Sequence, residues 1–201
     1  YELDYVAYES TDIGSCYFID ASLLKPGADC SPFYEEILPK FAGEMRSKKL
    51  LPMLEKCVAL LDGRSEYVFQ LGAMTGRGQD SSLRFFTSNM KKEGLISYLK
   101  DLSWSGNTEK LESLLTELES YSQNKNFILD FDIFETGISE KIGICFGTKN
   151  SFYKTIDKTL SDFVEKGFCL PSKKEGVMKW VKRYPSHTPQ IQNDISHFKF
   201  A

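Results

Sequence analysis

The feature that most constrains the fold of this chain is a repeated order of two strands followed by two helices. Apolar and polar residues alternate, as strands require, over 1–22, 66–89 and 126–147. Apolar residues at helical spacing follow each of these segments, and a last strand-like segment lies at 194–200. The order predicts a single domain, 1–201, of about three and a half such repeats.

This element order limits the architecture. Strands joined by short turns form antiparallel hairpins, and helix pairs between the hairpins must cover one face of the sheet. A sheet covered on one side by all its helices can curl and close, with strands inside and helices outside. We therefore expect an α+β fold of ββαα repeats, with a strongly curved or closed, barrel-like antiparallel sheet. An open sheet with water on its second face explains the alternation equally well.

Alternation also assigns side chains to the two faces of the sheet. We expect the apolar residues at one strand parity to face the helices: Tyr67, Phe69, Leu71, Leu83, Phe85, Phe127, Leu129, Phe131, Ile133, Ile142, Ile144, Phe146, Phe198 and Phe200. The opposite parity places a polar set on the inner face: Gln70, Arg84, Asp130, Asp132, Lys141, His197 and Lys199.

Local signals predict where several helices begin and end. Ser31 before Pro32 is a candidate N-cap, and Asn107 or Thr108 is a second one. Gly63 is a candidate C-cap. The tryptophan of 102–107, between two predicted helices, is interpreted as a packing residue.

Composition is that of an ordinary globular protein, with 41% hydrophobic and 26% charged residues. The net charge of -3 gives no reason to expect a nucleic-acid partner. No apolar run approaches the ~18 residues of a membrane span. Five cysteines, an odd number without CxxC spacing, favour reduced thiols and a cytoplasmic location.

Asp130 and Asp132 form the most informative polar pair. Residues two apart on a strand share a face and lie about 7 Å apart, which suits one Mg²⁺ ion or a shared proton. The same carboxylates could simply be solvated, or could form salt bridges with Arg84, Lys141 or Lys199. These three interpretations remain open at the level of the sequence.

Two further segments carry candidate chemistry. His197 shares a strand face with Lys199, and a neighbouring cation favours the neutral imidazole that a catalytic base requires. A structural, solvent-exposed histidine is the alternative. The glycine-rich segment 72–80 lacks the Lys-Ser/Thr of a Walker loop and is typical of a hairpin turn. In a functional interpretation, its backbone amides and Arg77 meet an anion.

The repeated element order with charged inner strand faces resembles the ABBA-type (PT-barrel) aromatic prenyltransferases. The resemblance implies a prenyl diphosphate inside the barrel and an aromatic or peptide acceptor beside it. It implies that Arg84, Lys141 and Lys199, from three successive hairpins, hold the diphosphate, and that a carboxylate, Asp130 or Asp132, accepts the acceptor's proton. Because these carboxylates would repel a diphosphate, we expect Mg²⁺ between them. Gln70 on the inner face and Arg77 in the glycine-rich segment are further candidate substrate contacts, and His197 is a further candidate base.

The resemblance leaves two alternatives open. The sequence predicts seven strands where the family has ten, so the chain is either a segment of a longer protein or a reduced relative. The chain is also similar, less closely, to bacterial proteins encoded beside genes that modify ribosomal peptides, in the runs "QLGAMTGRGQDSSLRF", "YLKDLSWSGN", "DFDIFETGISEKIGICFG" and "ISHFKF". A non-catalytic protein that binds a peptide in such a pathway is therefore the alternative to an enzyme.

Overall fold

The computed structural model describes the backbone of residues 2–5, 13–75, 82–122, 124–147, 152–183 and 197–200. The surroundings of side chains are described for 17–73, 82–122, 124–147 and 156–179. All statements below concern these ranges.

The strands occur in the expected pairs. They are β1 (Glu2–Tyr5), β2 (Ile13–Asp20), β3 (Val68–Thr75), β4 (Leu83–Thr87), β5 (Met90–Lys91), β6 (Asn126–Phe134), β7 (Gly137–Gly147) and β8 (His197–Phe200). The sequence predicts seven of them, and the two-residue strand β5 is the one it misses. Every pairing is antiparallel.

The helices also fall between the strand pairs as expected. They are the π-helical turn η1 (Phe33–Ile37), α1 (Leu38–Ala42), α2 (Glu44–Ala59), α3 (Lys92–Asp101), α4 (Thr108–Leu118), α5 (Phe152–Glu165) and α6 (Pro171–Arg183). None of these helices is both long enough and apolar enough to cross a membrane.

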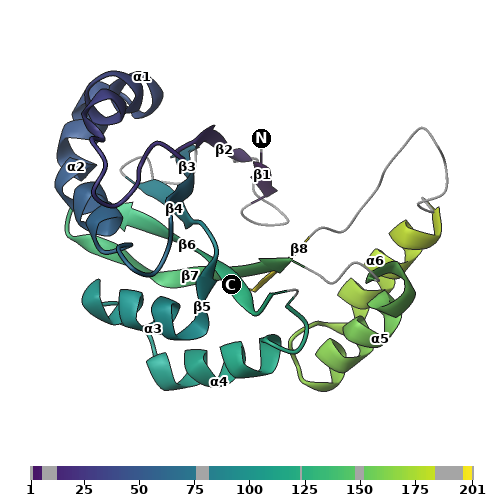
Figure 1. The fold of residues 1–201 in the computed structure, drawn as a ribbon. Helices are drawn as coiled ribbons and strands as arrows, with labels where there is room; N and C mark the ends of the chain where they lie inside the picture. The colour runs from purple at the N-terminus through teal and green to yellow at the C-terminus, as the bar shows by residue number, and fades with distance from the viewer. Residues whose placement is uncertain are drawn as a thin grey trace.

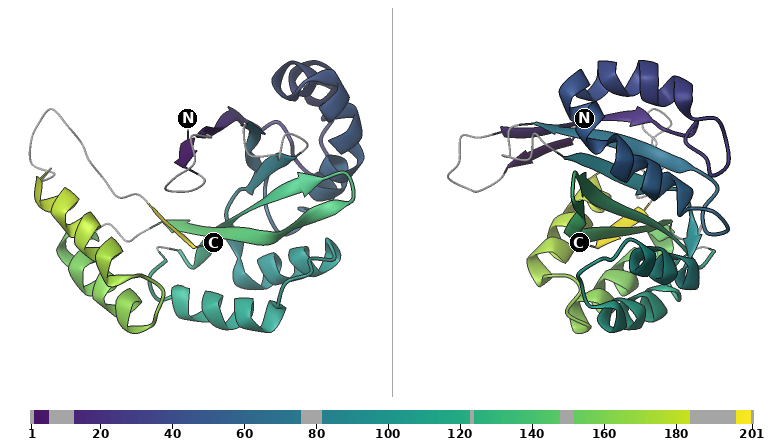
Figure 2. Two further views of the ribbon diagram at one scale, coloured as in Figure 1. Left: turned by 180° about the vertical axis from the view of Figure 1, so that it is seen from behind. Right: turned by 90° about the vertical axis from the view of Figure 1, so that its left-hand side faces the viewer.

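The sheet has the strand order β1-β2-β3-β4-β6-β7-β8, and β5 pairs with β6 beside this path. Figure 1 shows the sheet bending through an arc, with the helix pairs outside the arc, and the opposite view in Figure 2 agrees. Among the described residues, the end strands β1 and β8 pair only with β2 and β7. The mixed antiparallel fold is therefore confirmed, whereas the expectation of a closed, barrel-like sheet is not supported.

The core lies between the sheet and the helices that cover it, including α5, whose Ile156, Leu160 and Phe163 are buried. Phe131 of β6 stacks on Phe85 of β4, with ring centroids 5.2 Å apart, and Tyr98 of α3 packs on its other side at 6.3 Å. The Tyr98 hydroxyl donates a hydrogen bond of 2.9 Å to the carbonyl oxygen of Cys57 in α2. Because α2 and α3 both contact β6, this bond ties two successive helix pairs to the central strand.

The expected apolar parity is confirmed on β4 and β6. Leu83, Phe85, Leu129 and Ile133 are all fully buried on the helix side. The expectation fails at Phe69, whose side chain is 41% exposed.

The failure at Phe69 has a local cause. A bulge between Val68 and Gln70 shifts the register of β3 against β4. Val68 therefore occupies the core position that strict alternation assigns to Phe69.

Helix ends follow the predicted signals in one of three cases. The Asn107 side chain accepts a hydrogen bond of 2.8 Å from the backbone N–H of Lys110, which confirms it as the N-cap of α4. The C-cap role predicted for Gly63 is wrong: α2 ends at Ala59 with Leu60 as its C-cap, and Gly63, with a positive φ of 68°, lies in the turn that follows. The capping role predicted for Ser31 is wrong: its backbone N–H instead donates to the side chain of Asp29, at 3.0 Å.

The buried pair of Cys57 and Tyr98 predicts a loss of stability at alkaline pH. Burial raises the pKa of the Cys57 thiol to about 12 and raises the pKa of Tyr98 well above its ordinary value. Both pKa values lie above those of the unfolded chain, so both groups contribute stability that is complete below the unfolded values. This stability is lost as pH rises from the unfolded pKa values through the folded ones.

We expect the melting temperature followed by circular dichroism to be constant near neutral pH and to fall from about pH 9 upward. In the Tyr98→Phe variant, the lost hydrogen bond should cost about 1 kcal/mol at neutral pH. That variant should also show a shallower alkaline decline. A melting temperature that stays flat to about pH 11 in the unmodified protein would contradict this account.

Candidate functional site

The candidate site is the face of the sheet that points away from the helices, here called the inner face. Strand register aligns its residues in cross-strand rows. One row runs from Phe18 on β2 through Gly72 on β3 and Arg84 on β4 to Asp132 on β6. The next row is Asp20, Gln70, Phe86, Asp130 and Gly143, from β2 to β7. Gly72 beside Arg84 and Gly143 beside Asp130 leave each of these polar side chains without a bulky neighbour on one side.

Arg84 and Asp132 form the strongest polar contact of the inner face. They are direct cross-strand partners, and the guanidinium binds the carboxylate through two parallel hydrogen bonds. Arg84 Nε donates to Oδ1 at 3.0 Å, and Nη2 donates to Oδ2 at 3.1 Å. The Arg84 side chain is 18% exposed. Of the alternatives left open by the sequence, the salt bridge is the one that the structure shows for Asp132.

Asp130 lies one row away from this pair. It has Phe86 opposite on β4 and Gly143 opposite on β7. The buried thiol of Cys145 is oriented to donate to its Oδ2 at 3.9 Å. An acid and a nucleophilic sulfur thus meet on the inner face, on neighbouring strands.

The inner face is sheltered from water at its β6 positions, whereas Asp20 at the β2 end of the same row is exposed. A flat sheet with one solvated face would expose its carboxylates, yet Asp130 is only 3% exposed and Asp132 only 6%. Phe18 and Phe86 meet edge to face on the same side, with ring centroids 5.6 Å apart. The described inner face therefore combines a sheltered ion pair, a second buried carboxylate and an aromatic wall.

A wide bulge in β7 determines where Lys141 lies. Phe131 pairs with Ile142 and Ile133 pairs with Ile138, so the segment 139–141 of β7 stands opposite Asp132 alone. Lys141 is exposed, and its ammonium group forms no hydrogen bond or ion pair with a described residue. Arg84 binds Asp132, and the expected grouping of Lys141 with Arg84 and Lys199 around an anion stays a prediction.

Two side chains hold the bulge. The Ser139 hydroxyl accepts a hydrogen bond of 3.0 Å from the backbone N–H of Asp132 and donates one of 2.6 Å to the carbonyl oxygen of Lys141. From the helix side, Trp104 Nε1 donates to the carbonyl oxygen of Glu140 at 2.8 Å. The predicted packing role of Trp104 thus includes a specific hydrogen bond that the sequence did not signal.

The tryptophan itself is tightly seated. A Cβ added to Gly106 would lie 2.1 Å from Cζ2 of the Trp104 ring, so only glycine allows this close approach. The turn between α3 and α4 therefore positions the bulge, and the bulge positions Asp132.

The remaining predicted site residues are only partly placed. Gln70 is half-buried in the row of Asp130. Lys199 and His197 lie on β8, where their backbones pair with Cys145 and Gly147 of β7. The side chains of these two residues are outside the described part of the chain. Arg77 lies outside the described residues.

The residues of the described ranges do not form an evident metal centre. No group of three or more His, Cys, Asp or Glu side chains gathers in the part of the chain whose side chains are placed. Both oxygens of Asp132 accept from Arg84, so this carboxylate is engaged by a guanidinium rather than presented to a cation. The Mg²⁺ expected from the resemblance stays a prediction, and no reaction step below depends on it.

The site as described defines an α+β protein with a sheltered, mixed polar and aromatic inner sheet face. Comparison with known proteins gives no match: no family model, no curated protein and no solved structure corresponds to this chain.

The ion pair of the inner face should be important for stability. Replacing Arg84 by Gln leaves a buried carboxylate without its bidentate partner, and we expect a loss of about 3 kcal/mol in the free energy of unfolding. Asp132→Asn should cost a similar amount, and the double variant should cost less than the sum of the two. Urea denaturation of the four proteins measures this coupling.

The matched control is the exposed pair of Lys166 and Glu117, with atoms 2.9 Å apart. Lys166→Gln should leave stability nearly unchanged, since water screens an exposed pair. Strict additivity of the two inner-face substitutions would show that Arg84 and Asp132 do not stabilise one another.

The bulge predicts a large effect from a small substitution. Ser139→Ala removes the acceptor for the backbone N–H of Asp132, and leaving such a group unpaired should cost about 1–3 kcal/mol. Ser113→Ala, at an exposed position of α4, is the control and should be nearly neutral. Equal unfolding free energies for the two variants in urea would refute the role given to Ser139.

Proposed function

We propose that the inner face binds an allylic prenyl diphosphate and transfers its prenyl group to an aromatic or peptide acceptor, as the resemblance to ABBA-type prenyltransferases implies. One observation carries the proposal: the buried carboxylates Asp130 and Asp132, the latter paired with the half-buried Arg84, lie next to the Phe18–Phe86 aromatic pair. Charge, a proton acceptor and aromatic rings are the three elements that such a reaction needs in a place sheltered from water.

Each inner-face group has a role in the proposed reaction. The C–O bond of the allylic diphosphate breaks, and the diphosphate leaves with the electron pair. Arg84 stabilises the charge that develops on the leaving group, and Asp132 holds its guanidinium plane. Phe18 and Phe86 shield the allylic cation by presenting ring electrons. An aromatic carbon of the acceptor then forms the new C–C bond, and its proton passes to the Asp130 carboxylate.

The allylic cation must be protected from water until the acceptor reacts with it. Water would capture an allylic cation before the acceptor could react, so the donor must be held where water is excluded. The low exposure of Asp130 and Asp132 shows that inner-face positions on β6 are sheltered. The free thiols of Cys30, Cys57 and Cys145, which are all buried, suit the reducing cytoplasm in which we place this activity.

A second candidate function follows from the open sheet. In the described part of the chain, β1 and β8 end the sheet without a further partner strand. A strand edge can accept an extended peptide by main-chain hydrogen bonds. This arrangement suits a non-catalytic protein that presents a peptide to a modifying enzyme, and it needs neither Arg84 nor Asp130 for chemistry.

Incubation with dimethylallyl or geranyl diphosphate and a tyrosine- or tryptophan-containing peptide, followed by mass spectrometry, separates the two functions. The enzyme predicts a peptide that gains one prenyl group. Calorimetry with pyrophosphate, with and without Mg²⁺, measures binding of the leaving group. Arg84→Gln should weaken pyrophosphate binding by roughly tenfold or more, because a charge-assisted pair of hydrogen bonds is lost.

Asp130→Asn distinguishes catalysis from binding. It should abolish prenyl transfer while pyrophosphate binding is kept or strengthened, since a repelling negative charge is removed. Lys166→Gln, on the outer surface, should alter neither activity nor binding. If the unmodified protein binds no pyrophosphate at any Mg²⁺ concentration, the transferase proposal fails. Peptide binding that survives in Asp130→Asn without any prenyl transfer would instead favour the accessory function.

A further inference from the structure

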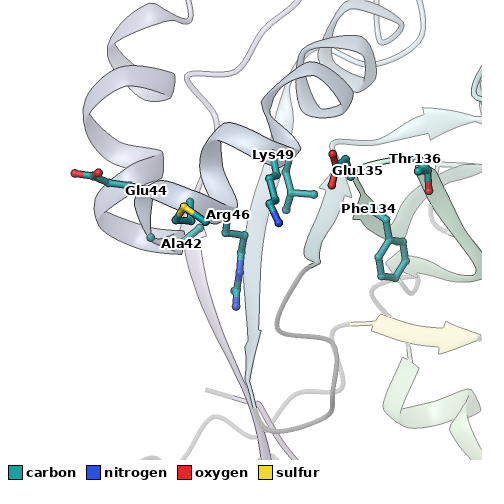
Figure 3. A pocket seen from close by; sticks show the side chains of 10 residues that line it. Ala42, Glu44, Arg46, Lys49, Phe134, Glu135 and Thr136 are labelled. Carbon is teal, nitrogen blue, oxygen red and sulfur yellow. The ribbon is translucent and has the colours of Figure 1, made fainter.

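A second site of different character lies at the rim of the sheet. A groove of about 770 Å³ separates the start of α2 from the turn between β6 and β7. It is lined by Ala42, Gly43, Glu44, Met45, Arg46, Lys49, Leu50, Phe134, Glu135 and Thr136, and Figure 3 shows most of these side chains. Its volume lies within the range of about 300–1,000 Å³ that is typical of small-molecule sites.

The helical wall of the groove carries positive charge. Arg46 and Lys49 are three residues apart on α2, so they lie on the same side of the helix. Arg46 is half-buried, yet neither side chain makes a hydrogen bond or an ion pair with any residue that the structure describes. A half-buried guanidinium without an anionic partner gains most from a ligand that supplies one.

The two acids of the groove, Glu44 and Glu135, form no ion pair with these cations. Figure 3 shows the Glu44 carboxylate directed away from the hairpin that forms the opposite wall. Glu135, in the turn of that hairpin, is exposed and forms no ion pair with Arg46 or Lys49. Its negative charge across the groove favours a ligand with one negative charge over one with several.

The rest of the lining is apolar. Leu50 is almost completely buried on the helical wall, and Phe134 contributes an aromatic ring from the hairpin. Met45 is 74% exposed at the groove, where a flexible thioether can adapt to different apolar shapes. A ligand with a negatively charged group and an apolar part could therefore contact the cations with the first and the apolar side chains with the second.

We propose that this groove binds a free amphiphilic monoanion, a small molecule with an apolar or aromatic body and one carboxylate or sulfate-like head. Arg46 and Lys49 bind the head, and Leu50, Phe134 and Met45 cover the body. The site is independent of the proposed prenyl transfer, because it uses none of the residues of the inner-face ion pair. A diphosphate is disfavoured here, since Glu135 opposes its additional charge.

Anilinonaphthalene sulfonate is a suitable probe, because it is an aromatic monoanion whose fluorescence rises in an apolar site. The folded protein should bind it, and the variant carrying both Arg46→Gln and Lys49→Gln should bind it at least about tenfold more weakly. Lys48→Gln with Lys56→Gln removes the same charge from exposed positions of α2 outside the groove and is the matched control. Phe134→Ala should weaken binding as well, by loss of the apolar contact.

Competition defines the ligand class. Octanoate and octyl sulfate should displace the dye, whereas inorganic sulfate should fail at the same concentration because it lacks a body. Vesicles containing anionic phospholipid should not displace it, since the proposal is for a free amphiphile. The neutral analogue phenylnaphthylamine should bind weakly and equally to the double variant and to the unmodified protein.

Several outcomes would overturn the proposal. These are no dye binding by the folded protein, equal losses in the groove variant and its control, displacement by inorganic sulfate as effective as by octyl sulfate, or displacement by vesicles. Circular dichroism melts establish that each variant is folded. Prenyl transfer and pyrophosphate binding should be unchanged in the Arg46 and Lys49 variant, so a failure here leaves the proposed transferase untouched, and the reverse also holds.

Discussion

Burial of β6 on both of its faces is the constraint on which the rest of the structure depends. On the helix side, Phe131 lies between Phe85 and Tyr98 and belongs to the hydrophobic core. On the other side, the same strand carries two carboxylates that are nearly inaccessible to water. A charge in such a position must be compensated, and Arg84 on the adjacent strand compensates one of them. Two helices, α2 and α3, cover one face of β6. The other face lies on the inside of the curved sheet (Figure 1).

The arrangement separates two kinds of binding chemistry on one scaffold. The inner face offers an ion pair and aromatic rings in a sheltered place, whereas the rim groove offers two cations and an apolar wall. Phe134, at the end of β6, is the point where the strand that carries the inner carboxylates reaches the groove. A protein that handles an apolar donor and a second amphiphilic molecule would need two such sites, with different preferences for charge.

Much of the fold follows from the sequence because the alternation of β4 and β6 is regular. Leu129, Phe131 and Ile133 are buried as their parity requires, and the same parity correctly places Asp130 and Asp132 on the other face. The sequence cannot show bulges in the same way. In β3 a one-residue shift exchanges the roles of two adjacent apolar residues, so alternation gives no warning. The pairing of Arg84 with Asp132 was one of several options, because the choice among nearby cations depends on register rather than residue type. Whether the sheet closes depends on the positions of its end strands, β1 and β8, and the alternation of residues does not determine those positions.

The wide bulge of β7 has a consequence for how this chain can change in length. Three residues of β7, 139–141, stand opposite one residue of β6, Asp132. The residues on either side of them, Ile138 and Ile142, both pack on the core. Because the surplus is two residues, it leaves the faces of the strand unchanged. Related chains could therefore lose or gain a pair of residues at this point without turning the strand over, whereas a single insertion would bring the core residues of the strand to the inner face. The hairpin thus contains a place where evolution can vary the rim of the site in steps of two while the sheet behind it stays intact.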